Sequence, residues 1–437
     1  METPATIKTP ATTKTMVTPR IHDAALAELQ ANAGANIGVW FGCALPNDFG
    51  DPAAEYRFAN QSVALLDKNY RAYLSFTGQD RVRYLNAILT NNIKDLAAGQ
   101  GTISLLLNPQ GHILAELETY ALADQHFCVS YAMIREQLIG WMDKFIIMDD
   151  VTLTDETERW GTLALEGPKA ATAVKQVTGV ALESLSELAS LDAAILQPQK
   201  ARPQDDNMGE ARLVSEAPPS VIPSAARNPG TISAQPSPMS APPFSAPSCV
   251  TDPLPCRIVK RSPGGVPGAE FVVERANLAP LWQILLEAVR KHGGGPLGYT
   301  ALSGQRLAQG VAWFGYDFGE KQIPHEAGLE NSHISYTKGC YTGQEIVERV
   351  RSRGHVNRRR VTLLFSGDAV PEAGAPLTTP DGKEAGYVTR AARIWDPERI
   401  IGMGYVGTAY IRAEADAPGT ILHWPGGSAS ILGKSKS

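Results

Sequence analysis

One break in composition divides the chain and limits what it can fold into. Residues 196–255 hold 13 of the 31 prolines, almost no aromatic residues and no helical or strand period. Such a segment cannot bury enough apolar surface to offset the entropy lost on ordering it. We therefore predict a disordered Pro/Ser-rich insertion over 196–256, with the core built from the flanking blocks, 21–195 and 257–437.

Overall composition excludes several classes of protein. The chain has 437 residues, enough for two or three domains, and 43% of them are hydrophobic, which supplies ample core. Its net charge of −5 and pI near 6.0 argue against a protein that coats nucleic acid. Because no apolar run approaches the roughly 18 residues that a membrane-spanning helix needs, we expect no membrane span.

The N-terminus and the cysteines bear on location. Residues 1–20 are rich in Thr and Pro and lack the apolar core of a signal peptide, so we predict a disordered tail. The five cysteines form no C-x-x-C pair, and the eight histidines show no ligand spacing, so we expect neither disulfides nor a metal site. Cys249 and Cys256 are expected to be free thiols in a loop. We expect a monomer in the reducing cytoplasm.

The flanking blocks show mixed α and β patterns. Residues 72–77 alternate as in a half-buried strand, and a hairpin with its turn at 109–111 follows, in which Ile113, Ala115 and Leu117 face away from Glu116 and Glu118. After the insertion come two strands and an amphipathic helix. The last 80 residues consist of short strands and turns, typical of a small barrel or sandwich. These patterns predict an α+β fold, with a mixed α/β region over 21–195 and 257–357 and a small barrel or sandwich over 358–437.

The most informative segment is residues 338–345, KGCYTGQE. Thr342 and Glu345 have the spacing of a capping box, which predicts a helix that begins near Gly343. Cys340 would precede that helix, where unpaired backbone N–H groups and Lys338 favour a thiolate. Gly339 and Gly343 would let the backbone approach a ligand closely. From spacing alone, a capped helix after a buried, inert cysteine is an equal alternative.

This segment matches every fixed position of the K-G-C-Y-x-G-Q-E signature of the YgfZ family, the folate-binding relatives of the glycine-cleavage T-protein. The flanking sequences RLAQGVAWFGYDFGEKQIPHEAG and RGHVNRR also resemble that family, and LLLNPQGHILAELETY is similar to its early hairpin. Apart from the predicted tail and insertion, the resemblance covers nearly the whole chain.

The resemblance implies a T-protein (aminomethyltransferase)-like fold, in which a folate-binding α/β body surrounds a channel and carries a C-terminal β-barrel. It also implies tetrahydrofolate as cofactor and a role in the upkeep of iron–sulfur enzymes, such as a tRNA methylthiotransferase, without a defined turnover reaction. Cys340 and Lys338 would form the reactive centre. The remaining signature residues, which would bind the ligand or shape the motif, are Gly339, Tyr341, Gly343, Gln344 and Glu345.

Two residues outside the signature are candidates for folate binding. Glu270 is similar to the T-protein glutamate that grips the pterin ring, a role that suits a carboxylate able to accept two hydrogen bonds. Arg306 matches the family's arginine and could pair with a folate carboxylate. For Glu270 the alternative is a solvated glutamate at a strand edge, and for Arg306 it is a structural salt bridge.

Residues 349–360, RVRSRGHVNRRR, hold six arginines in twelve positions. From Lys338 to Arg360 seven basic and two acidic residues give +5, which leaves −10 for the rest of a chain of net charge −5. This arginine strip, Arg349 to Arg360, could attract an anionic partner such as a polyglutamyl folate tail, a phosphate backbone or an acidic protein. A solvated interdomain linker is the equal alternative.

Three functions follow from these observations. The leading hypothesis is a folate-binding protein that supports iron–sulfur enzymes through Cys340. The alternative is an aminomethyltransferase of the T-protein type, which needs an acidic pair in the early hairpin. The matching positions here are Ala115 and Glu116, so one carboxylate is missing, and the T-protein lacks the KGCYTGQE signature. An RNA-binding module, based on the arginine strip alone, comes third.

Overall fold

The computed structural model describes residues 23–195, 253–262, 264–367, 369–395 and 404–434. The predicted tail and most of the predicted insertion, with Cys249, lie outside these residues. The insertion was predicted to end at residue 256, which is wrong, because β11 (Leu254–Lys260) already pairs with β10 there. Cys256 therefore lies buried in a strand rather than in a loop.

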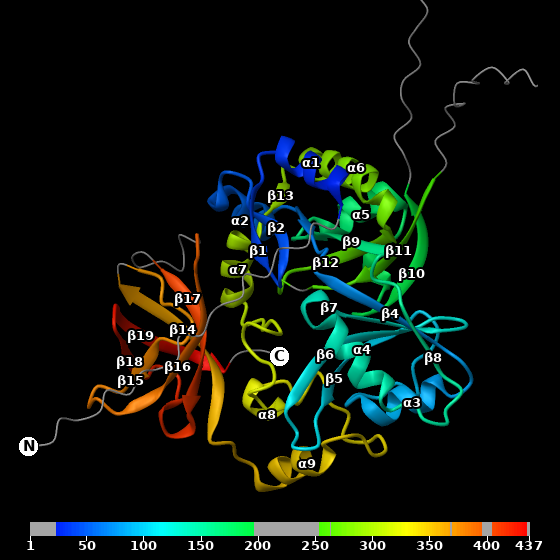
Figure 1. The fold of residues 1–437 in the computed structure, drawn as a ribbon. Helices are drawn as coiled ribbons and strands as arrows, with labels where there is room; N and C mark the ends of the chain where they lie inside the picture. The colour runs from blue at the N-terminus through cyan, green and yellow to red at the C-terminus, as the bar shows by residue number, and fades with distance from the viewer. Residues whose placement is uncertain (1–22, 196–252, 263, 368, 396–403, 435–437) are drawn as a thin grey trace, which may run out of the picture. The chain divides into compact units, whose positions relative to one another are not determined.

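The first sheet of the body has six strands in the order β10-β11-β12-β9-β3-β13. Its strands, besides β11, are β3 (Ala64–Asp67), β9 (Trp160–Glu166), β10 (Ser190–Ile195), β12 (Gly268–Glu274) and β13 (Gly295–Leu297). One face packs against α1 (Ala24–Asn32), α5 (Ala170–Thr178) and α6 (Leu278–Lys291) in a large apolar core (Figure 1). The insertion therefore interrupts a pair of neighbouring antiparallel strands in this sheet.

The opposite face of the first sheet carries a second core. Alternate residues of its strands, such as Ala64 and Leu66, point to this side, where they meet α2 (Pro52–Gln61) and α7 (Tyr299–Ala308). The hairpin of β1 (Asn36–Trp40) and β2 (Cys43–Asp48) completes the cluster. Both faces of the sheet are therefore covered at β3 and β9.

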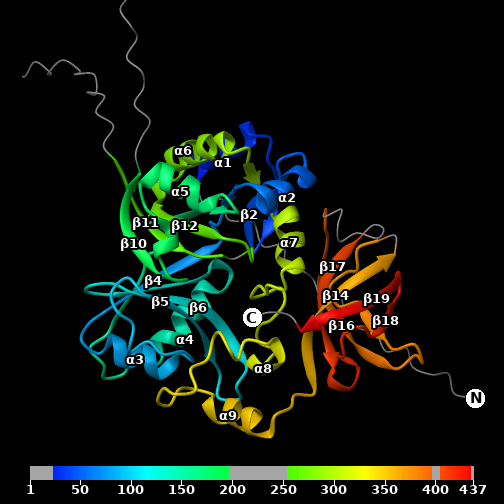
Figure 2. The same ribbon diagram turned by 180° about the vertical axis from the view of Figure 1, so that it is seen from behind.

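The second sheet has five strands in the order β5-β6-β7-β4-β8. They are β4 (Arg71–Thr77), β5 (Gly101–Leu107), β6 (Ile113–Ala121), β7 (His126–Tyr131) and β8 (Thr152–Asp155). The helices α3 (Arg81–Ile88) and α4 (Arg135–Asp143) cover one face, as the reverse view shows (Figure 2). The hairpin predicted around 109–111 is confirmed as β5 and β6.

The other face of the second sheet packs against the first sheet. Tyr73, on β4, and Val129, on β7, form one cluster with Val259 and Val272 of β11 and β12. The strand predicted over 72–77 is confirmed as β4, but the expected half-burial is wrong, since β4 is buried on both faces and only Thr77 is exposed. This packing encloses the polar side chains of β4, β6 and β12 between the two sheets.

A closed barrel follows, in the strand order β14-β17-β16-β15-β18-β19, and β19 pairs with β14 to close it. Its strands are β14 (Arg358–Gly367), β15 (Pro376–Thr378), β16 (Glu384–Arg393), β17 (Tyr405–Arg412), β18 (Ile421–Trp424) and β19 (Gly427–Lys434). The predicted α+β fold with a C-terminal β-barrel is confirmed.

Two short elements join body and barrel, α8 (Pro324–Ala327) and α9 (Gln344–Arg353). α8 contacts both α9 and β14. Within the described ranges, no helix is both long enough and apolar enough to cross a bilayer.

Candidate functional site

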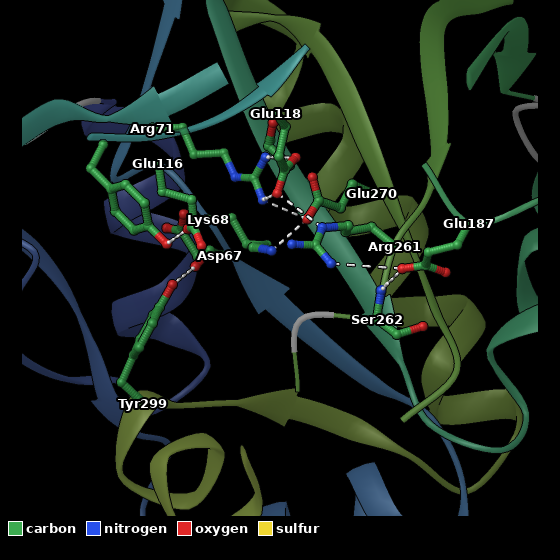
Figure 3. A network of polar contacts seen from close by, with 12 residues as sticks. Asp67, Lys68, Arg71, Glu116, Glu118, Glu187, Arg261, Ser262, Glu270 and Tyr299 are labelled. Atoms are coloured by element: carbon green, nitrogen blue, oxygen red, sulfur yellow. Dashed lines mark hydrogen bonds and ion pairs between the residues drawn. The ribbon is translucent and has the colours of Figure 1, made fainter. Parts of the chain in front are cut away.

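Buried charges meet between the two sheets (Figure 3). Arg71, at the start of β4, donates to Glu118 on β6 at 3.0 Å and to Glu270 on β12 at 2.7 Å. Lys68, in the turn between β3 and β4, donates to the same Glu270 oxygen. Because these side chains are almost fully buried, water and salt screen their attraction only weakly. We call this group, with Arg261, the inter-sheet network.

Glu118 has three partners in the inter-sheet network. Besides Arg71, it accepts from Arg261 Nε at 2.9 Å and from the Tyr120 hydroxyl at 2.7 Å. Burial would raise the pKa of Glu118, but the charges of Arg71 and Arg261 outweigh it and hold that pKa well below the usual range. Glu118 is therefore ionised at neutral pH.

Glu270 is 1% exposed, so the alternative of a solvated strand-edge glutamate is wrong. Its Oε1 accepts from both Lys68 and Arg71. Its Oε2 is buried and accepts no hydrogen bond from any residue that the structure describes. A buried carboxylate oxygen without a donor is costly, and native proteins rarely leave one unless a ligand or water supplies the donor.

Glu166, the last residue of β9, is a third buried carboxylate near the inter-sheet network. Burial raises the pKa of Glu166 to about 7, although the Lys68 ammonium opposes the rise. This group therefore changes its protonation near neutral pH, whereas Glu118 does not.

Glu116 lies two residues from Glu118 on the same side of β6. Its Oε2 accepts from the Tyr131 hydroxyl at 2.8 Å, and its Oε1 lies 3.0 Å from Nε2 of the buried His333. Glu116 and Glu118 both border a pocket of about 20 Å³, room for roughly one water molecule. His333, seven residues before Cys340 in sequence, thus contacts a residue that borders this pocket.

Lys338 directs its ammonium to α3, and within the described residues no hydrogen bond joins it to Cys340. Its ammonium donates to the carbonyl oxygens of Asn86 and Leu89 at the C-terminal end of α3, and it lies 5.0 Å from the centre of the Tyr341 ring. Burial lowers the pKa of Lys338 to about 8. A lysine in this position caps the unpaired carbonyls of a helix end, so the structure gives Lys338 a structural contact.

Cys340 is exposed, so the alternative of a buried, inert cysteine is wrong. The helix after it begins at Gln344, close to the prediction. The predicted capping box is wrong, however. Gly343 is the N-cap, with φ of 81°, and no side chain caps this helix. The exposed thiol therefore lies in an extended loop that precedes α9 by several residues.

The other signature residues mostly serve packing. A Cβ at Gly343 would lie 2.7 Å from the carbonyl oxygen of Asn108 in the hairpin turn, so the glycine lets the loop approach that turn. Gly339 faces open space, Tyr341 is buried in an apolar cluster, and Glu345 forms an exposed ion pair with Arg349. Gln344 is half-buried. The predicted close approach of Gly343 is thus to the protein itself.

Arg306 lies outside the inter-sheet network. It is fully buried on α7, where its guanidinium pairs with Asp317 and stacks 4.2 Å from the centre of the Trp313 ring. Asp317 also accepts from Thr408 of β17 at 2.6 Å. The structural salt bridge, the alternative to folate binding, is what the structure shows, and it joins α7 to the barrel.

Comparisons with known proteins agree with this architecture. Residues 23–196 match the family model described as the GCVT N-terminal domain. The aminomethyltransferase of Streptomyces avermitilis is 24% identical over 91% of this chain and 91% of its own length. That of Chlorobium phaeobacteroides is 25% identical over 83% and 84%.

Among solved structures, the glycine cleavage system aminomethyltransferase T from Bartonella henselae superposes with a TM-score of 0.71, at 19% identity, over 95% of this chain and 98% of that one. The chain has the aminomethyltransferase fold. The matches support a T-protein-like fold, and none of these three distinguishes the YgfZ family within it.

This fold changes the meaning of the missing carboxylate at Ala115. Neighbouring residues of a strand face opposite sides of a sheet. Ala115 is fully buried in the core under α3 and α4, whereas Glu116 faces the pocket. A carboxylate at position 115 would therefore point away from the pocket, and the side chain that faces the pocket is still acidic. The alanine at position 115 is therefore no longer an argument against an aminomethyltransferase.

Several residues of the site escaped the sequence analysis. Lys68, Arg71 and Arg261 lie next to turns, where charged residues are ordinarily solvated, and the Glu116 partner of His333 is 217 residues away in sequence. The available signal was weak. Lys68 and Arg71 lie at the two ends of the short turn between the apolar strands β3 and β4. A turn of that length leaves little room for both side chains to reach water.

Proposed function

We propose that the protein binds tetrahydrofolate between the two sheets, with the N–H groups of the pterin ring donating to Glu270. The observation that carries this proposal is the unpartnered, buried Oε2 of Glu270. Lys68 and Arg71 occupy the other oxygen and fix the orientation of the carboxylate. A carboxylate positioned in this way suits the adjacent amino and ring N–H groups of a pterin. Arg306, paired with Asp317, takes no part.

We further propose aminomethyl transfer as the activity that accompanies folate binding. The similar proteins favour this reading over a role in iron–sulfur upkeep, since those that align over more than four fifths of their length are named aminomethyltransferases. Glu116 is the residue of this chain that suits the reaction. An amine that leaves or arrives carries positive charge, and a carboxylate held by Tyr131 and His333 stabilises it at a fixed point.

Support of iron–sulfur enzymes, including a tRNA methylthiotransferase, is the second candidate. The specific observation in its favour is the exposed Cys340 within the complete KGCYTGQE signature. Loss of this role would leave folate binding intact, because Cys340 belongs to the loop before α9 and not to the inter-sheet network.

Titration calorimetry with tetrahydrofolate, run beside a glycine-cleavage assay, tests the proposal. Binding together with turnover supports aminomethyl transfer, and binding without turnover supports the second candidate. Two variants sharpen the result. Glu116→Gln should abolish turnover if aminomethyl transfer is the activity, and Cys340→Ser should abolish support of tRNA methylthiolation in cells, with folate binding retained, if the second candidate is correct. No binding of tetrahydrofolate would refute both.

A further inference from the structure

A second pocket, of about 300 Å³, lies where α8, α9 and the start of β14 meet. None of its lining residues belongs to the inter-sheet network. The signature segment lies in sequence between two of them, Tyr336 and Arg351. The charged and polar residues that line it are His325, Glu330, Asn331, Tyr336, Arg351, His355 and Arg359. Its volume is at the lower end of the range for small-molecule sites.

The arginine strip divides into different roles at this pocket. Arg358 is held by Glu326 at 3.1 and 3.3 Å, and Arg360 is buried and donates to two backbone carbonyls. Arg351 and Arg359 line the pocket and are held loosely. Arg351 lies 3.5 Å from Glu348, and Arg359 lies 3.8 Å from Asp416, beyond hydrogen-bond distance. Two guanidinium groups therefore have donors to offer a ligand.

The geometry of Arg351 favours planar recognition. Its guanidinium stacks on the Tyr336 ring, 4.1 Å from the ring centre. The Tyr336 hydroxyl in turn lies 3.1 Å from Nε2 of His325. A stacked guanidinium keeps its N–H groups in one plane, and this arrangement suits the two oxygens of a carboxylate or phosphate.

Two further atoms of the pocket residues are buried and lack a hydrogen-bond partner in the described part of the chain. They are Nδ1 of His325 and Oε2 of Glu330. When the Tyr336 hydroxyl donates to Nε2 of His325, Nδ1 carries a hydrogen and needs an acceptor. The Glu330 oxygen needs a donor. The pocket thus combines two arginine side chains with one unmatched donor and one unmatched acceptor.

From these contacts we infer an anion-binding site for a small molecule that carries a carboxylate or phosphate close to a hydrogen-bond donor. The oxyanion would bind Arg351, Arg359 and His325, and the donor would bind Glu330. A γ-linked glutamyl chain has this chemistry, with carboxylates and amide N–H groups in turn, and a phosphate ester with a neighbouring hydroxyl or amine shares it. The inference does not depend on the pterin site at Glu270.

Calorimetric titration of the full chain with γ-glutamylglutamate and with inorganic phosphate tests the site. The doubly substituted Arg351→Gln/Arg359→Gln chain should lose at least about tenfold in affinity for the probe that binds. The matched control is Arg349→Gln, which lies on the same helix but outside the pocket and should stay within about twofold. Glu330→Gln should weaken the dipeptide and leave phosphate unchanged or tighter.

The outcomes are distinct. Binding of the dipeptide alone points to a glutamyl ligand, and binding of phosphate alone points to a phosphate ester, provided that the arginine substitutions weaken it. Equal binding by the wild-type and doubly substituted chains, or no binding of either probe at about 10 mM, would overturn the inference. Binding of tetrahydrofolate monoglutamate should be unchanged in the doubly substituted chain. Failure of the pterin site would instead appear in the Glu270 variant.

Discussion

The inter-sheet network and the signature segment, residues 338–345, differ in how their residues are distributed along the chain and in what those residues contact. The network gathers Lys68, Arg71, Glu118, Arg261 and Glu270 from separate parts of the chain and leaves one carboxylate oxygen unmatched. The signature segment is continuous, and most of its side chains are engaged in packing or helix capping. Only Cys340 offers reactive chemistry to solvent. A conspicuous motif can thus hold a loop in place while dispersed residues build the binding site.

Removal of Arg71 should have the largest effect. Arg71→Met leaves Glu118 and Glu270 each without one buried partner, and breaking a buried ion pair from one side costs about 3–5 kcal/mol. Equilibrium unfolding in urea measures this loss. The control, Arg159→Met, removes an exposed ion pair with Glu274 and should cost less than about 1 kcal/mol. Equal losses in both variants would show that the inter-sheet network is not strongly coupled.

Glu270→Gln should weaken tetrahydrofolate binding by roughly ten- to a hundredfold, because a hydrogen bond to a charged group is worth about 1.5–3 kcal/mol. From the sequence alone, this substitution would be expected to spare stability. The structure predicts otherwise, since Lys68 and Arg71 lose their shared anion. Calorimetry and thermal unfolding should therefore change together.

The control for that experiment lies on the same strand. Glu274, at the exposed end of β12, has Arg159 as its one ion-pair partner among the residues that the structure describes. Glu274→Gln should leave the affinity for folate within about twofold and hardly change the melting temperature. Unchanged affinity in the Glu270 variant would mean that the pterin binds elsewhere.

Glu166 should make stability depend on pH. Its pKa rises from an ordinary value of 4.5 to about 7 in the folded chain, so between these values the folded state binds more protons than the unfolded state. Stability from this group is therefore complete below about pH 4.5 and is lost as the pH rises through 7. At pH 8 Glu166→Gln should be more stable than wild type by about 3 kcal/mol.

The measurement is urea unfolding of both chains at several pH values from 5 to 8. Only the difference between wild type and Glu166→Gln is informative, since other groups titrate in both chains. The difference should grow as the pH rises through neutrality. If the difference stays constant with pH, the pKa of Glu166 is not raised, and this residue does not titrate near neutral pH.

The resemblance to the T-protein relatives supplied the fold, whereas individual elements could be predicted because their signals are local. The hairpin turn at 109–111, the amphipathic α6 and the short strands of the barrel each follow from periodicity and turn residues. Sequence reasoning failed where tertiary packing decides. The alternation of residues 72–77 indicates one buried face, but the first sheet covers the other face as well.

The candidate site shows the same division. Glu270 was found through resemblance to the T-protein, whereas its partners Lys68 and Arg71 lie about 200 residues away in sequence. No local pattern joins such residues. Arg306 illustrates the converse, because its neighbourhood resembles the family while its actual partner is Asp317.

Cys340 should give the smallest change in stability and the clearest chemical contrast. In a background with Cys249→Ser, iodoacetamide should label Cys340 well before Cys128 or Cys256, because burial raises the pKa of both of those thiols to about 12. Mass spectrometry of a time course at pH 7.5 identifies the labelled residue.

Cys340→Ser, at an exposed position, should change the free energy of unfolding by no more than about 0.5 kcal/mol. The matched substitution Cys128→Ser places a hydroxyl in the buried core under α3 and α4 and should cost clearly more. If Cys340 proves slow to react, or if its serine variant unfolds as easily as that of Cys128, the signature segment is a packing element throughout and its thiol has no separate role.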